Sequence, residues 1–184
     1  MKKFLSNPTV AMILAVIVVL ATMFLSAKLD FGKQCKTVSD GFYTGMYGEA
    51  PIAGKLREFC GAAQQMVMLG QRYQVKGTEE VFEESEKLLD LLRNESREYE
   101  ELFSVYSQLL ADTFTLESNL TRTELSEDDQ TIYATAQHTA AEAKAGIDDS
   151  SYNNEARPLQ NQYKRFPTRQ LAALTGVDMP QLFA

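Results

Sequence analysis

The stretch TEEVFEESEKLLDLLRNESREYEELFSVYSQLLADTFTLESNL, residues 78–120, has the strongest helical periodicity in this chain of 184 residues. Its apolar residues recur at steps of three and four, which places them on one face of an α-helix. They fill both positions of a heptad seam, with Leu92, Tyr99, Tyr106, Thr113 and Leu120 at one and Leu88, Leu102, Leu109 and Leu116 at the other. Further apolar residues widen this stripe beyond a two-stranded seam, so we expect the segment to bury it in a helical bundle.

Nothing inside the stretch predicts a break in the helix. It contains neither Gly nor Pro, and Thr78 is a suitable N-cap. Glu79 and Glu80 suit the positive end of the helix dipole. Only Glu95 interrupts the leucines of the second seam position. We therefore expect one continuous helix over 78–120, about 60 Å long.

Helical patterns also precede and follow this stretch. Residues 52–75 repeat apolar residues at the same steps and end before Gly77, a helix stop signal. Ser126, with Asp129 three residues further on, forms an acidic variant of the capping box. It predicts the start of another helix, over about 127–166.

The C-terminal part of the chain is less regular. Pro158 removes a helical hydrogen bond, so the last long helix is expected to kink there or to divide at a joint between Gly146 and Ser151. A short helix is expected at 168–174, and the apolar tail that follows it is expected to pack on the bundle. Residues 52–184 are thus predicted to form an all-α domain, an antiparallel bundle of long helices.

The N-terminal part has a different composition. Residues 9–27, TVAMILAVIVVLATMFLSA, carry no charge and would form a helix of about 28 Å, close to the thickness of a bilayer core. We interpret them as one transmembrane helix, after a short basic N-terminus at 1–8. A cleaved signal peptide fits less well, because the apolar run is long and Leu25 occupies a position that needs a small residue. Residues 28–51, rich in Gly, are predicted to be an irregular juxtamembrane connector.

The orientation of such a span follows only weakly from its flanking charges. Two lysines precede the apolar run, and three follow it: Lys2 and Lys3 before, and Lys28, Lys33 and Lys36 after. The short basic start favours an amino end inside the cell and a domain outside the cytoplasm. The resulting prediction is a single-pass membrane protein with an extracytoplasmic domain.

Charge and metal-ligand content exclude several functions. All 25 acidic residues and 16 of the 18 basic residues follow residue 27, so this part has a formal charge of −9. Such a surface does not suit nucleic acid. Cys35 and Cys60 form no CxxC motif, and His138 is the only histidine, so we expect no zinc or di-iron site. Whether the two cysteines pair depends on the compartment.

We also expect no catalytic residues and no cofactor. The acidic residues that could act as acids or bases fall on a charged helix face without a nucleophile or a phosphate-binding loop: Glu142, Asp148, Asp149 and Glu155. A solvated surface explains this group better than an active site does. The sequence therefore favours a protein that is not an enzyme.

The C-terminal third contains a recognisable pattern of residues. Its elements are Tyr152-Asn153, Arg157, Phe166-Pro167, Leu171-Ala172, Gly176 and a terminal Phe183. Their order and spacing resemble the end of LemA family proteins. The absence of a Pro at 57–62 departs from the family pattern, so the chain resembles a diverged member. The resemblance implies a helical protein tethered to the bacterial cell membrane, and it supplies no catalytic residues.

Two functions are compatible with these patterns. The first is a non-catalytic scaffold or adaptor, held in the lipid bilayer through residues 9–27. It would form a homo-oligomer or bind another membrane-associated protein through its wide apolar stripe. The alternative is an extracytoplasmic ligand-sensing bundle, which would hold a small molecule between its helices.

Overall fold

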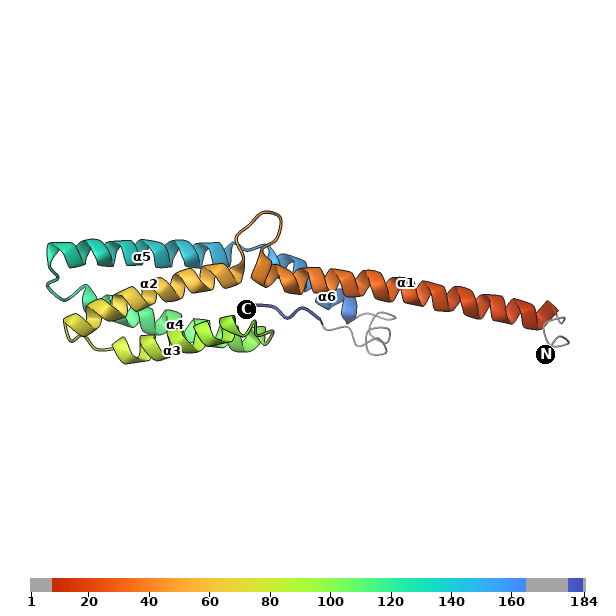
Figure 1. The fold of residues 1–184 in the computed structure, drawn as a ribbon, viewed down its shortest axis with the longest axis horizontal. Coiled ribbons are helices and arrows are strands. Elements are labelled where there is room, and N and C mark those ends of the chain that lie inside the picture. Colours follow the sequence, from red (N-terminus) through yellow and green to blue (C-terminus); the bar gives the residue numbers. More distant parts are fainter. Residues whose placement is uncertain (1–7, 165–178, 184) are drawn as a thin grey trace.

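The computed structural model describes residues 8–164 and 179–183, except for the side chains of residues 8–11, 13, 20, 23, 24 and 27. These residues contain six helices and no strand, which confirms the all-α prediction (Figure 1). The helices are α1 (Pro8–Thr44), α2 (Ile52–Arg72), α3 (Thr78–Arg93), α4 (Tyr99–Leu120), α5 (Glu127–Asp148) and α6 (Tyr152–Tyr163).

The helices α2 to α5 run back and forth as an elongated bundle, and α1 extends away from one end of it (Figure 1). Helix α2 is central, since it packs against α5 on one side and against α3 and α4 on the other. Its buried residues, among them Leu56, Phe59 and Met66, form the middle of the core. Helix α3 packs against α4, but α4 and α5 do not pack closely against each other.

The prediction of one helix over 78–120 is wrong, because the chain reverses between α3 and α4. Glu95 adopts a left-handed conformation with φ 47°. The amide of Ser96 then donates to the carbonyl of Leu91 at 3.0 Å, and that of Glu95 to Leu92 at 3.4 Å. These two bonds form the Schellman motif that ends many helices. Folding back gives the apolar faces of α3 and α4 a partner in each other, which one straight helix would lack.

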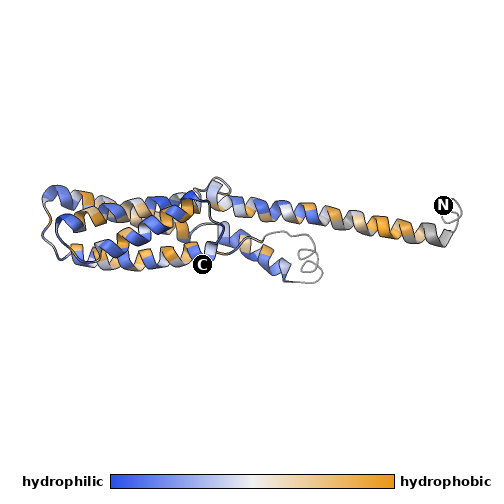
Figure 2. Ribbon diagram, turned by 60° about the horizontal axis from the view of Figure 1, so that its bottom comes forward, coloured by the Kyte–Doolittle hydropathy of each residue, from blue (hydrophilic) through white to orange (hydrophobic). Residues whose placement is uncertain are grey.

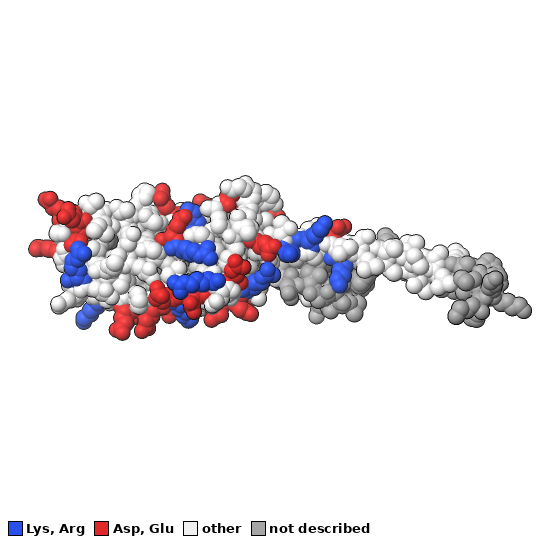
Figure 3. Space-filling model, in the orientation of Figure 1, with Lys and Arg blue, Asp and Glu red and all other residues white. Residues whose placement is uncertain are grey.

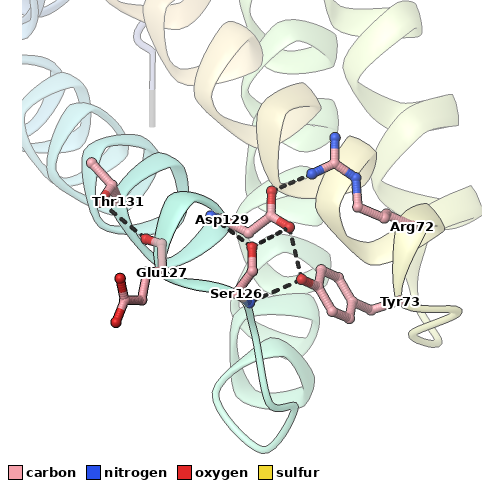
Figure 4. A network of polar contacts seen from close by, with 6 residues as sticks. All are labelled: Arg72, Tyr73, Ser126, Glu127, Asp129 and Thr131. Carbon is pink, nitrogen blue, oxygen red and sulfur yellow. Dashed lines mark hydrogen bonds and ion pairs between the residues drawn. The ribbon is translucent and has the colours of Figure 1, made fainter.

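The predicted helix start at Ser126 is confirmed, and a tyrosine completes it (Figure 4). Ser126 Oγ accepts a hydrogen bond from the amide of Asp129 at 3.3 Å. The Tyr73 hydroxyl at the end of α2 accepts from the amide of Ser126 at 3.0 Å and donates to Asp129 Oδ2 at 2.7 Å. Arg72 pairs with the other carboxylate oxygen. The side chain of Asp is one methylene shorter than that of Glu, and Tyr73 bridges the gap that a Glu would span in a capping box.

The last predicted helix is divided at the expected joint. Helix α5 ends at Asp148 and α6 begins at Tyr152, so the form with a joint between Gly146 and Ser151 is confirmed and a single helix over 127–166 is not. Pro158 lies inside α6. The expected helix at 168–174 lies outside the described residues. The end of the tail does pack on the bundle, where Phe183 is buried.

The prediction of a membrane span in the N-terminal part is wrong. The described part of the chain contains no helix that is both long and apolar enough to cross a lipid bilayer. This finding overturns the transmembrane helix at 9–27 and the placement of the chain in a bacterial cell membrane with an extracytoplasmic domain. Helix α1 also runs on without a break through the charged residues Lys28, Asp30 and Lys33. Of the irregular connector predicted at 28–51, residues 28–44 are helical, and only residues 45–51 are irregular.

Candidate interaction sites

The inner end of α1 is mounted on the bundle by a cluster of aromatic rings. Phe42 has no exposed surface. The centroid of its ring lies 4.6 Å from that of Tyr99 in α4, 5.5 Å from that of Tyr152 in α6 and 5.4 Å from that of Phe183 in the tail. Val38 and Cys35, one and two turns earlier in α1, are also buried. The inner half of α1, residues 31–44, is thus part of the core.

The tyrosine hydroxyls of this cluster donate to backbone carbonyls. Tyr43 donates to Ser96 at 2.6 Å, Tyr99 donates to Ser39 at 3.1 Å, and Tyr152 donates to Gln181 at 2.8 Å. Burial raises the pKa of Tyr43 to about 12 and also raises the pKa of Tyr99 and of Tyr152. The phenols therefore remain neutral donors at neutral pH, and they hold α1, the α3–α4 turn and the tail together.

The structure brings together three residues of the C-terminal sequence motif. Asn153 Nδ2 donates to the carbonyl of Phe183 at 2.7 Å, and Asn153 Oδ1 accepts from its amide at 2.9 Å. Tyr152 contacts Phe42 in the cluster. Arg157 is exposed on α6. The remaining motif residues lie outside the described part of the chain: Phe166, Pro167, Leu171, Ala172 and Gly176.

The outer part of α1 forms an apolar arm, which we define as residues 12–29 (Figure 2). Val16, Ile17, Val18 and Val19 are consecutive, and each is between 51% and 58% exposed. Because four consecutive residues point to all sides of a helix, the arm has no covered face there. The space-filling view shows charged side chains over the bundle and uncharged surface along most of the arm (Figure 3), in which Lys28 at the inner end is the one charged residue.

A second site is the groove between α4 and α5, with a volume of about 670 Å³. Leu110 and Phe114 of α4, Ala140 and Ala141 of α5, and Phe59 of α2 line it. Sequence analysis did not find this groove. The signals that could have indicated it are the small residues along the inner face of α5 and the two apolar residues of α4 beyond the heptad seam.

The described residues bring no group of three or more His, Cys, Asp or Glu side chains into a geometry that could hold a metal. His138 is exposed, with Nδ1 3.4 Å from Glu142 Oε2. Lys144 pairs with Asp148. Cys35 and Cys60 are buried and unpaired, and burial raises the pKa of the Cys60 thiol to about 12. Both thiols are poorly suited to act as nucleophiles.

Comparison of the chain with protein-family models, with curated proteins and with solved structures found no match. The resemblance to the LemA family therefore stays a prediction from the residues quoted above.

Proposed function

We propose that this protein is a non-catalytic helical scaffold or adaptor, which assembles with itself or with a partner protein through the apolar arm of α1. The single observation that carries the proposal is the exposure of large apolar side chains along the arm: Met12, Leu14, Val16, Ile17, Val18, Val19, Leu25 and Leu29. An exposed apolar surface of this extent is typical of an interaction site.

The way in which α1 is mounted supports the same function. An isolated helix forms with difficulty in water because its first turn is costly to nucleate, and most helical stability in proteins comes from packing. Here the arm continues directly from the inner half of α1, where Phe42 is fixed by three other elements. The arm therefore projects from the bundle in a defined direction and would present about 27 Å of apolar helix to a partner.

Charge also favours a partner bound along the arm rather than on the bundle. The part of the chain after residue 27 has a formal charge of −9, so the bundles of two copies repel each other. The residues Tyr152, Asn153 and Phe183, on which the resemblance to LemA proteins partly rests, hold the base of α1 in place.

Sedimentation equilibrium of the full chain tests the proposal. In a variant with Val16→Gln, Ile17→Gln and Val18→Gln, we expect association to weaken roughly 100-fold, because each side chain loses burial that contributes about 1 kcal/mol or more. Phe82→Gln removes an exposed apolar side chain from α3 and serves as the control, with no change expected. Equal association of the arm variant and the unmodified chain would contradict the proposal.

The alternative function, a helical bundle that binds a small ligand, is favoured by a different observation. The open groove between α4 and α5 has a volume of about 670 Å³, within the range of small-molecule sites.

A further inference from the structure

The end of the chain, residues 179–183, is held on the bundle through its main chain. We call this segment the tail, and it is not helical. Side chains of α6 make four hydrogen bonds to its backbone: Gln160 to the carbonyl of Pro180 at 3.0 Å, Tyr152 to the carbonyl of Gln181 at 2.8 Å, and Asn153 to the amide and the carbonyl of Phe183 at 2.9 and 2.7 Å. Bonds of this kind form with any peptide in the same backbone conformation, and they are the usual source of affinity where a protein binds a peptide.

One polar side chain of the tail is also bound. Gln181 Oε1 accepts a hydrogen bond from the amide of Tyr99 at 3.0 Å. Tyr99 is the first residue of α4, and Glu98, the N-cap residue before it, makes no capping bond with its side chain. The amides at the start of a helix need acceptors from outside the helix. The tail therefore supplies a cap that α4 itself lacks, and this position selects a side chain with an acceptor.

A single aromatic ring anchors the tail. Phe183 is 3% exposed, and its ring centroid lies 5.4 Å from that of Phe42, 5.3 Å from that of Phe103 and 5.9 Å from that of Tyr106. The neighbouring Leu182 is only partly buried. The bundle thus recognises a peptide backbone, an acceptor side chain and, two residues further on, an aromatic ring.

Space and charge around the tail indicate which source of peptide fits best. A hollow of about 670 Å³ lies beside the described tail, with Gln181, Arg97 and Lys164 among its lining residues. A segment bulkier than the tail therefore has room. The part of the chain after residue 27 carries a formal charge of −9, so a second copy that brought its own tail to this place would bring a repelling bundle with it. These observations favour a segment of a different protein.

We propose that the α6 side chains Tyr152, Asn153 and Gln160, the start of α4 and the aromatic pocket around Phe183 form a peptide-binding site, which the protein fills with its own tail. Its ligand is a nonhelical segment of a partner protein with an acceptor side chain two residues before a phenylalanine. The partner segment binds by displacing the tail. The site is separate from the arm and does not depend on the function proposed for it.

A synthetic peptide with the sequence of residues 177–184, VDMPQLFA, tests this assignment on the full chain. It carries fluorescein at its amino end, and fluorescence anisotropy measures its affinity. In Phe183→Ala the attached tail loses its anchor while the site keeps all its residues. We expect this variant to bind the peptide at least about tenfold more tightly than the unmodified chain, in which the attached tail competes at a high effective concentration.

Matched variants locate the binding. Added to Phe183→Ala, Asn153→Ala should weaken the peptide about tenfold or more, because both bonds to the anchor residue are lost. Asn154→Ala, at the exposed neighbouring position, should leave the affinity unchanged. A peptide with alanine in place of its phenylalanine should not bind. Gln181→Ala removes only the partly exposed capping side chain, so it loosens the tail with little risk to the fold and should raise the affinity about threefold.

Three results would overturn the proposal. The first is equal affinity of the peptide for the unmodified chain, for Phe183→Ala and for Gln181→Ala, and the second is binding that Asn153→Ala does not weaken. The third concerns the source of the peptide. Phe183→Ala and the unmodified chain, both with the three arm substitutions to Gln, are mixed and sedimented. A 1:1 complex would assign the site to the tail of a second copy.

Discussion

The two halves of α1 belong to one uninterrupted helix but differ in how their apolar residues are arranged. In the inner half, residues 31–44, the apolar residues form one stripe through Cys35, Val38 and Phe42, and this stripe is buried against the bundle. In the arm the apolar residues whose side chains are described lie on all sides of the helix, and they are exposed. A one-sided stripe needs one neighbouring surface, whereas a helix that is apolar all round needs surroundings on every side. The bundle supplies one neighbouring surface, which is enough to cover the inner half but not the arm.

The two halves should differ most in how much a side-chain truncation lowers the free energy of unfolding. We expect Phe42→Ala to destabilise the chain by about 3–5 kcal/mol, because it removes a fully buried ring from the centre of the aromatic cluster. We expect Val18→Ala in the arm to change the free energy of unfolding by less than about 0.5 kcal/mol, since that side chain is exposed. Urea denaturation followed by circular dichroism measures both. Similar losses for the two variants would show that the arm is already buried against a partner.

Loosening the tail should weaken the inner half and leave the arm unaffected. Asn153→Ala removes both hydrogen bonds that hold the backbone of Phe183, at a cost of about 2 kcal/mol. We expect faster amide hydrogen exchange over residues 35–42, which pack beneath the tail, and unchanged exchange over the arm. Asn154→Ala, at the exposed neighbouring position, is the matched control. If exchange at residues 35–42 did not change, the tail would have no part in mounting α1.

Alkaline pH should act on the inner half of α1 but not on the arm, because Tyr43 is partly buried in the inner half and residues 12–29 contain no tyrosine. Unfolded tyrosine has a pKa of about 10. Burial raises the pKa of Tyr43 to about 12, so folding favours the neutral phenol. The resulting stability is complete below pH 10 and is lost as the pH rises toward 12. We expect the midpoint of urea denaturation to fall over this interval, and to fall less steeply in Tyr43→Phe.

The smallest effect is expected in the turn that receives the Tyr43 hydrogen bond. Glu95→Gly should stabilise the chain by about 0.5–1 kcal/mol, because glycine adopts the left-handed conformation at this position without strain. Thermal unfolding measures the gain. Glu98→Gly, only three residues further on but with a negative φ of −78°, should destabilise instead. A loss of stability in Glu95→Gly would mean that the Glu95 side chain contributes more than the backbone conformation costs.

These expectations show which features of the fold follow from the sequence. The helix start at Ser126 was predictable because the cap uses residues three positions apart. The turn at Glu95 was not, because its left-handed position carries Glu where glycine is the usual signal. The prediction that the apolar arm spans a membrane was wrong. It rested on the composition of residues 9–27 alone. Composition does not say where a helix ends or which residues its inner end contacts. The groove could not be predicted either, because it depends on the distance that α2 sets between α4 and α5.

The two buried cysteines can be used to measure how the protein opens, because each reacts only when its surroundings unfold or move away. Cys35 lies where α1 meets the bundle, and Cys60 lies in the centre of α2. Alkylating reagents react with the thiolate, and burial both shields these sulfur atoms and raises their pKa, so labelling requires the chain to open. Detachment of α1 from an intact bundle would expose Cys35 alone, whereas global unfolding exposes both. The order in which the two sites react with iodoacetamide therefore distinguishes a swing of the first helix from loss of the whole fold.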